Sequence, residues 1–154
     1  MGSIKDKANY LIKKYNTNCP FEIANYLGIQ VVYEPLGTVE GYYNKLFRVP
    51  IIHINQHTKN EKYVCAHELG HAINHPETNT SFLKKYTLFS NDKIEVEANT
   101  FAVELLLPDN LLIDQIHKNF TIYDVFRENG IPEQFISLKT IDSKFFNRKK
   151  EHTF

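Results

Sequence analysis

Long hydrophobic runs, cysteines and an excess of charge of either sign are all scarce in this sequence, and each absence excludes a class of protein. No apolar run is long enough to span a bilayer, and the N-terminus is followed by an amphipathic segment. Eighteen Lys and Arg balance 18 Asp and Glu, so bulk charge does not draw the chain to nucleic acid or to anionic membranes. Two cysteines, Cys19 and Cys65, are too few for a disulfide scaffold, and we expect both to be reduced and buried. These absences favour a cytoplasmic protein.

The composition predicts one compact domain spanning residues 1–154. A chain of 154 residues with 42% hydrophobic and 13% aromatic residues has enough apolar material for a single core. No internal repeat and no low-complexity stretch interrupts it. Within it we expect a catalytic core at about 19–108 and a helical C-terminal part at 109–146.

The most informative segment is residues 67–71, which read His-Glu-Leu-Gly-His. Two histidines at i and i+4 project from the same face of a helix, so His67 and His71 can reach one metal ion while Glu68 lies beside them. Thr58 and Glu61 have the spacing of a capping box, which predicts a helix that begins just after Thr58. That helix is apolar on more than one side, and buried polar side chains are costly without partners, so a functional site is favoured.

A catalytic zinc site takes three protein ligands and one water, so the third ligand must come from elsewhere. A helix is predicted at about 92–107, capped by Ser90 or Asn91 and ended by Pro108. We predict that Glu97 on this helix is the third ligand, because small residues at 98 and 102 allow close approach to the histidine helix. Its other acids, Glu95 and Glu104, are interpreted as solvated surface charges.

His75 is the alternative third ligand, one further turn beyond His71. Residues i, i+4 and i+8 of a straight helix are spread over about 12 Å, so their side chains cannot close tetrahedrally around one ion. We therefore expect His75, which precedes Pro76, to lie at the helix end and to bond the last carbonyls. Cys65 lies about 200° around the helix from His67 and is not expected to be a ligand.

The remaining pattern predicts an α+β fold. Helical spacing at 4–15 and 20–28 is followed by three strand-like runs at about 29–36, 40–46 and 49–55. We expect a small antiparallel sheet packed against the histidine helix, with an edge to which an extended substrate can add as a strand. Further helices are predicted near 109–118, 121–129 and 132–146, as a cover or a docking surface for a protein partner.

Several segments together resemble the ImmA/IrrE family of bacterial metallopeptidases. They run, in the family's order and spacing, from Cys19-Pro20-Phe21 through Gly41-Tyr42-Tyr43 and the histidine motif to Glu97-Ala98-Asn99 and Leu105-Leu106-Leu107-Pro108. Residues 78–90 and the region around Gly130 are similar to the ImmA branch, the anti-repressor proteases of mobile elements and phages. Leu107 stands where many members have Met, a difference that concerns packing only.

The resemblance implies a zincin-like cytoplasmic metallo-endopeptidase that site-specifically cleaves a helix-turn-helix repressor encoded nearby, without binding nucleic acid or membrane itself. It places the zinc ligands on His67, His71 and Glu97 and the catalytic base on Glu68. The residues alone indicate the same reaction class, with one Zn2+ preferred but manganese and cobalt not excluded by ligand type. The alternative is a zinc-containing regulatory module that sequesters the repressor without cleaving it.

Other contributors to the site are left open by the sequence. Asn99 is a candidate to orient a ligating histidine through a hydrogen bond. Candidates to help stabilise an oxyanion, with simple packing as the alternative for each, are Tyr42, Tyr43, Tyr86, His53 and His57.

Overall fold

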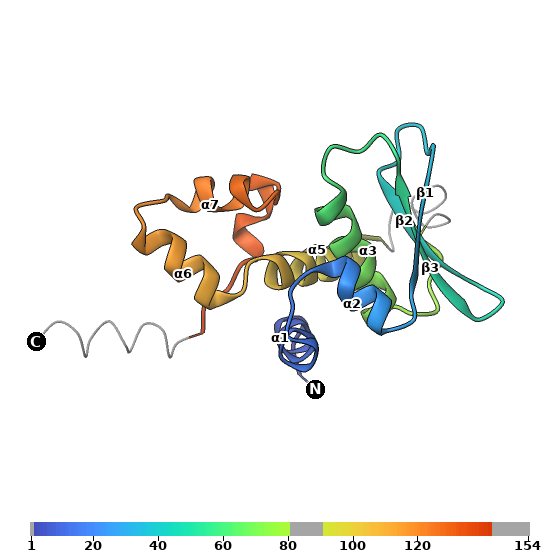
Figure 1. The fold of residues 1–154 in the computed structure, drawn as a ribbon, viewed down its shortest axis with the longest axis horizontal. Helices are drawn as coiled ribbons and strands as arrows, with labels where there is room; N and C mark the ends of the chain where they lie inside the picture. Colours follow the sequence, from blue (N-terminus) through green and yellow to red (C-terminus); the bar gives the residue numbers. More distant parts are fainter. Residues whose placement is uncertain (1, 81–90, 143–154) are drawn as a thin grey trace, which may run out of the picture.

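The computed structural model describes residues 2–80 and 91–142 as an α+β fold, which confirms the predicted class. Figure 1 shows the sheet at one end of the molecule, the C-terminal elements at the other, and helix α5 (Asn91–Leu106) running between them. None of the helices in the described ranges is long and apolar enough to cross a membrane.

The sheet consists of β1 (Gln30–Glu34), β2 (Gly41–Leu46) and β3 (Val49–Asn55), close to the three predicted runs. Their order is β1-β3-β2: β2 and β3 form an antiparallel hairpin, whereas β1 pairs with β3 in parallel. The expectation of a wholly antiparallel sheet is therefore corrected. The physical reason is that β3 inserts between the other two strands, and a strand that follows two reversals runs in the direction of the first.

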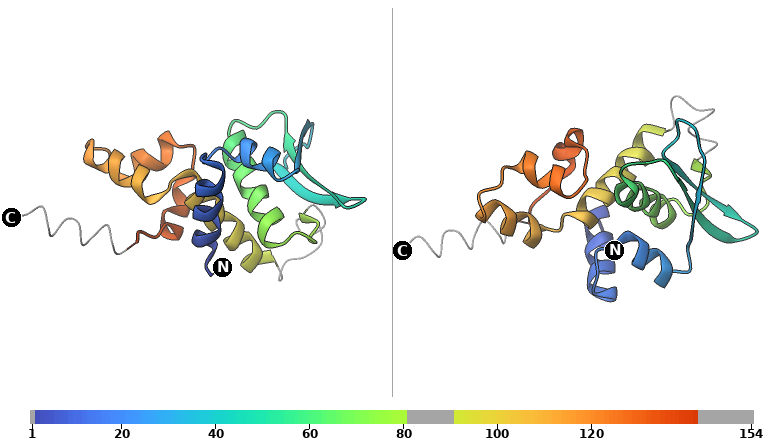
Figure 2. Two further views of the ribbon diagram at one scale, coloured as in Figure 1. Left: turned by 60° about the horizontal axis from the view of Figure 1, so that its bottom comes forward. Right: turned by 45° about the horizontal axis from the view of Figure 1, so that its top comes forward.

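Helix α3 (Glu61–Asn74) lies against one face of this sheet and carries the histidine motif (Figure 2). The strand residues that face it alternate, with Tyr43, Ile52 and Ile54 all buried. Residues 63–72 of α3 are buried on every side of the helix, as its apolar composition predicts. The predicted capping box is wrong: α3 begins after Asn60, and the Thr58 hydroxyl accepts a hydrogen bond from the Asn60 backbone N–H instead.

Helices α1 (Ile4–Tyr15) and α2 (Pro20–Tyr26) complete the core around α3 and α5 (Asn91–Leu106). Cys65 is buried and Cys19 is partly exposed, and both are free thiols. Helix α5 ends before Pro108, as predicted. Ser90, one of its two predicted caps, lies outside the described residues.

Close contact between α3 and α5 depends on Gly70. A Cβ added there would lie 3.1 Å from the Ala98 Cα, 3.1 Å from the Ala98 carbonyl oxygen and 3.1 Å from the Phe101 Cβ. These atoms belong to or adjoin the α5 backbone, which cannot give way as a flexible side chain can. The absence of a side chain at Gly70 thus allows α3 and α5 to approach each other closely.

Overpacking in Gly70→Ala costs about 1–3 kcal/mol, of which the better helix propensity of Ala offsets roughly 1 kcal/mol, so we predict a net destabilisation of up to about 2 kcal/mol. Urea unfolding followed by circular dichroism measures the loss. Lys62→Ala, at an exposed position of the same helix, is the control and should change stability by less than about 0.5 kcal/mol. Equal midpoints for the two variants would show that the helices have room to adjust.

The C-terminal part contains α6 (Asp109–His117), α7 (Ile122–Glu128) and a short 3-10 helix, η1 (Glu133–Leu138). Thr121 caps α7 in a capping box with Asp124, so its predicted role as a helix start is confirmed. The predicted helix at 132–146 is replaced by η1 alone within the described part, and residues 143–146 lie outside it. The reason is that Lys139, just after η1, is held by a buried ion cluster rather than by a continuing helix.

Candidate metal centre

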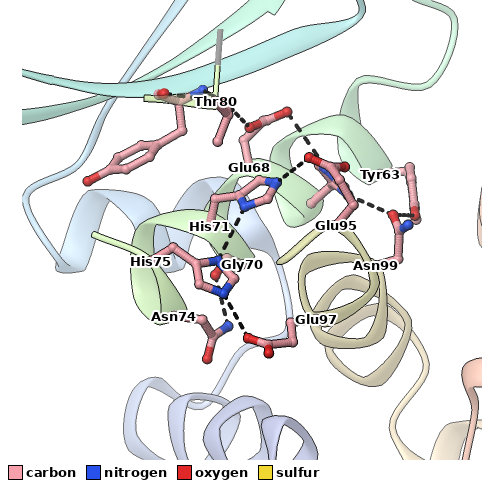
Figure 3. Close-up of polar contacts among 12 residues, drawn as sticks. Tyr63, Glu68, Gly70, His71, Asn74, His75, Thr80, Glu95, Glu97 and Asn99 are labelled. Atoms are coloured by element: carbon pink, nitrogen blue, oxygen red, sulfur yellow. Dashed lines mark hydrogen bonds and ion pairs between the residues drawn. The ribbon is translucent and has the colours of Figure 1, made fainter. Parts of the chain in front are cut away.

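Helices α3 and α5 bring two imidazoles and one carboxylate together. Nε2 of His67 lies 3.0 Å from one oxygen of Glu95, and Nε2 of His71 lies 3.1 Å from the other (Figure 3). One ligand atom from each of these three residues lies within 4.8 Å of the other two, so the group can hold a metal ion. His71 is fully buried and His67 is 8% exposed, which keeps most solvent away from the cluster.

The carboxylate in this cluster belongs to Glu95, and the prediction of Glu97 is corrected. The Glu97 carboxylate is 2.7 Å from Nε2 of His75, at the end of α3. The reason is helix geometry: Glu97 is about 200° around α5 from Glu95. The interpretation of Glu95 as a solvated charge is corrected with it. His75 joins Glu97 with its side chain, while its backbone N–H bonds the His71 carbonyl.

A sequence signal for Glu95 did exist. Asn99 follows Glu95 by four residues, so the two side chains share one face of α5, just as His67 and His71 share one face of α3. Two i, i+4 pairs of possible ligating or orienting side chains on neighbouring helices match each other, whereas the residue four positions after Glu97 is the apolar Phe101.

Asn99 holds His67 from the far side of the ring, in the orienting role for which its position in the sequence made it a candidate. Nδ1–H of His67 donates to Oδ1 of Asn99 at 2.7 Å, and the Tyr63 hydroxyl donates to the same oxygen at 2.7 Å. Burial raises the pKa of the Tyr63 phenol, so the hydroxyl keeps its proton and remains a donor. With Nδ1 committed to Asn99, it is Nε2 of His67 that faces Glu95.

The charge of Glu95 is stabilised by the two histidines. Burial by itself raises the pKa of this carboxyl, but when His67 and His71 carry a proton on Nε2 their hydrogen bonds to Glu95 outweigh burial and hold the pKa below its ordinary value. Glu95 is therefore a carboxylate at neutral pH, the form that binds a cation.

Glu68 lies beside this cluster and is 1% exposed. One of its oxygens is 4.0 Å from Nε2 of His67, and the other is 3.3 Å from the hydroxyl of Thr80. Thr80 is buried and also accepts a 2.7 Å hydrogen bond from the backbone N–H of Tyr43 on β2. Thr80 could not be recognised as part of the site from the sequence, because nothing in the local pattern places it against β2.

A cleft of about 630 Å³ opens onto the cluster. His67, Glu68 and Glu95 lie along it together with Gly41 at the start of β2. Its walls are completed by the segment at 57–60 and by Pro132, Gln134 and Phe135. The rings of Tyr63 and Phe135 stack at 5.7 Å, so the C-terminal part forms one wall of the cleft.

The candidates for oxyanion stabilisation differ in whether they line the cleft. His57 lines the cleft. The Tyr43 hydroxyl donates to the Pro76 carbonyl at 2.7 Å, and Tyr42 stacks on His53 at 4.0 Å, so these three side chains have other partners. Tyr86 lies outside the described residues.

Comparison with known proteins gives three consistent matches. Residues 24–140 match a peptidase family, M78, described as the IrrE N-terminal-like domain. The chain is 44% identical over 143 residues to the uncharacterized immunity region protein 2 of Bacillus phage phi105, covering 90% of this chain and 89% of that protein. It is 35% identical over 111 residues to the metallopeptidase ImmA of Bacillus subtilis strain 168, covering 71% of this chain and 66% of ImmA.

Proposed function

This chain belongs to the metallopeptidase family of the IrrE N-terminal-like domain, and from that premise we propose that it is a zinc endopeptidase that cuts a helix-turn-helix repressor at one specific site. The observation that carries the proposal is the cluster of His67, His71 and Glu95 with buried Glu68 beside it.

The donor set fits a metal ion. A neutral imidazole has one N–H, and His67 uses it on Asn99, so Nε2 presents a lone pair to the Glu95 carboxylate at 3.0 Å. Two lone pairs that face each other require a cation between them or a second proton on the ring. We assign His67, His71 and Glu95 as the ligands, and two nitrogens with one oxygen suit zinc. Zinc held by these residues would supply a Lewis acid and lower the pKa of a bound water to about 7.

Glu68 is the proposed general base and acid. Its carboxylate adjoins His67 along the cleft, where it can take a proton from the attacking water and pass it to the leaving amine. The Thr80 hydroxyl, 3.3 Å from Glu68, helps to fix the carboxylate in this position. A structural metal site needs no base beside its ligands, so a buried Glu68 favours hydrolysis over the sequestering module.

We propose that the substrate binds in extended form along the start of β2. Gly41 lines the cleft, and a Cβ added there would be 2.6 Å from a Val64 methyl and 2.8 Å from the His53 carbonyl oxygen, so only glycine fits. Farther along the strand, Thr80 already bonds the backbone of Tyr43. Thr80 therefore occupies the edge of β2 at Tyr43, and an added strand there would require Thr80 to move.

The proposed substrate follows from the relatives rather than from the cleft. One relative is named for a phage immunity region and another is named a metallopeptidase, which supports a protease that acts on an immunity repressor. Since such a repressor works on DNA inside the cell, the proposal places the enzyme in the cytoplasm.

The test is incubation of the purified protein with the repressor encoded beside its gene, followed by mass spectrometry of the fragments. We expect one cleavage site, loss of cleavage with a metal chelator, and recovery when Zn2+ is restored. Cleavage that persists in chelator would contradict the metal proposal. Tight binding of an intact repressor with no fragments would instead support the sequestering module.

A further inference from the structure

His71 is supported on the side that faces away from the cluster. Its Nδ1 lies 3.4 Å from Nδ1 of His75, and Nε2 of His75 lies 2.7 Å from an oxygen of Glu97 (Figure 3). The three side chains thus form a row from the candidate metal site outward, from His71 to His75 to Glu97. His75 and Glu97 are neither proposed metal ligands nor the proposed base.

Only one arrangement of hydrogens satisfies this row when Nε2 of His71 is to bind a metal. His71 must then carry its proton on Nδ1, and that N–H donates to Nδ1 of His75. His75 must in turn carry its proton on Nε2, and that N–H donates to the Glu97 carboxylate. Glu97 can only accept, so the carboxylate at the end fixes the direction of every bond in the row.

The positions of His75 and Glu97 are fixed by the end of helix α3 and by the partial burial of both side chains. His75 is the residue that caps α3, and its backbone N–H bonds the His71 carbonyl at 2.7 Å, which keeps the two rings one turn apart. The His75 side chain is 11% exposed and that of Glu97 is 28% exposed, so the pair is shielded more than a surface ion pair. Exposed ion pairs in the same chain, such as Lys118 with Asp114, have side chains that are 66% and 59% exposed.

The two histidines of the cluster therefore receive matching support from α5. Asn99 accepts from Nδ1 of His67 directly, and Glu97 acts on Nδ1 of His71 through His75. We propose that His75 and Glu97 are positioning residues that fix the tautomer and orientation of His71 for metal binding, an inference that rests on the metal site proposed above. Removal of such partners typically weakens metal affinity by about 10–100-fold.

The experiment measures the Zn2+ dissociation constant by competition with a chromophoric chelator. We expect His75→Ala and Glu97→Gln each to raise it by about 10–100-fold, and Asn99→Ala to do the same through His67. The matched controls are His117→Gln and Glu128→Gln, which change the same residue types at exposed positions and should bind Zn2+ like the unmodified protein.

A double variant shows whether Glu97 acts on His71 through His75 or whether the two residues act independently. If His75 transmits the influence of Glu97, then Glu97→Gln has no further effect once His75→Ala is present, and the two effects are not additive. Additive effects would overturn the series arrangement. Melting temperatures of the metal-free variants, which should stay close to that of the unmodified protein, separate a loss of positioning from a loss of folding.

The ligand variants keep the two proposals apart. His71→Ala should abolish tight Zn2+ binding; if it does not, the proposed metal site itself is wrong. If His71→Ala abolishes binding but His75→Ala and Glu97→Gln bind Zn2+ like the controls, only the positioning role fails. Should His75→Ala not fold, the nearly isosteric Glu97→Gln, at a side chain that is 28% exposed, decides the question alone.

Discussion

Glu68→Gln is expected to lower kcat for peptide cleavage by about 10²–10⁴-fold while leaving the fold and the bound metal in place. Glutamine has the same shape but takes up no proton at neutral pH. Its amide can still bond Thr80, whose hydroxyl is 3.3 Å from the Glu68 carboxylate, so the side chain should keep its position. The loss should fall on kcat rather than on KM, because Glu68 is not assigned to substrate binding.

The measurement is steady-state cleavage of the repressor, with zinc content determined on the same sample. Glu40→Gln is the matched control: Glu40 also lines the cleft, but it is exposed and lies away from the histidine motif in the sequence. We expect its kcat to stay within a few fold. A Glu68→Gln protein that cleaves at the rate of Glu40→Gln would remove Glu68 from the mechanism.

The parts of the site that local periodicity determines were predictable from the sequence. His67 and His71 share a face because they are four residues apart on one helix, and the start of the C-terminal helix at Thr121 follows from its capping box. The three strands were predicted nearly to their bounds, because short runs rich in β-branched and aromatic residues, separated by turn residues, are typical of strands.

The choice between Glu95 and Glu97 depends on which side of α5 faces the histidines of α3. The two helices meet where Gly70 packs against Ala98, a contact between residues far apart in the sequence. A shift of two residues on α5 moves a carboxylate from one flank of the buried face to the other. The parallel pairing of β1 with β3 was likewise not predictable from the sequence, because β1 pairs with a strand that is not its neighbour in the chain.

Glu104 is a further case in which a local pattern misleads. Its place among other acids on α5 suggested a solvated charge, but it is 1% exposed and lies 2.6 Å from the Lys139 ammonium. A buried carboxylate is costly unless it is paired, and its partners, Lys139 and Lys5, come from opposite ends of the chain. Sequence periodicity carries no information about such long-range pairs.

Lys139→Met is expected to reduce the free energy of unfolding by about 3–5 kcal/mol, the cost of breaking a buried ion pair from one side. The Lys139 ammonium lies 2.6 Å from both Glu104 and Asp109, and its side chain is only 2% exposed. Without it, two buried carboxylates share Lys5, whose ammonium is 3.4 Å from Glu104 and 2.8 Å from Asp109. Urea unfolding measures the change as a lower midpoint at constant slope.

The exposed ion pair between Lys118 and Asp114 provides the control. Lys118→Met should cost less than about 1 kcal/mol, because solvent screens that pair. Adding Glu104→Gln to Lys139→Met should recover part of the loss, since one of the unpaired charges is then gone. If Lys139→Met unfolds at the same urea concentration as Lys118→Met, the cluster does not stabilise the fold.

The same cluster predicts how stability depends on pH. Burial raises the pKa of Asp109, but hydrogen bonds from Lys139 and Lys5 outweigh burial and hold the pKa below its ordinary value of 3.8. A depressed pKa means that the unfolded chain takes up the proton first, so this contribution is complete above pH 3.8 and is lost as the pH falls toward the folded-state value. Lys139→Met should weaken that acid dependence. Because Lys139 follows η1, which carries Phe135 into the cleft, loosening the ion cluster should also raise KM for the proposed repressor substrate.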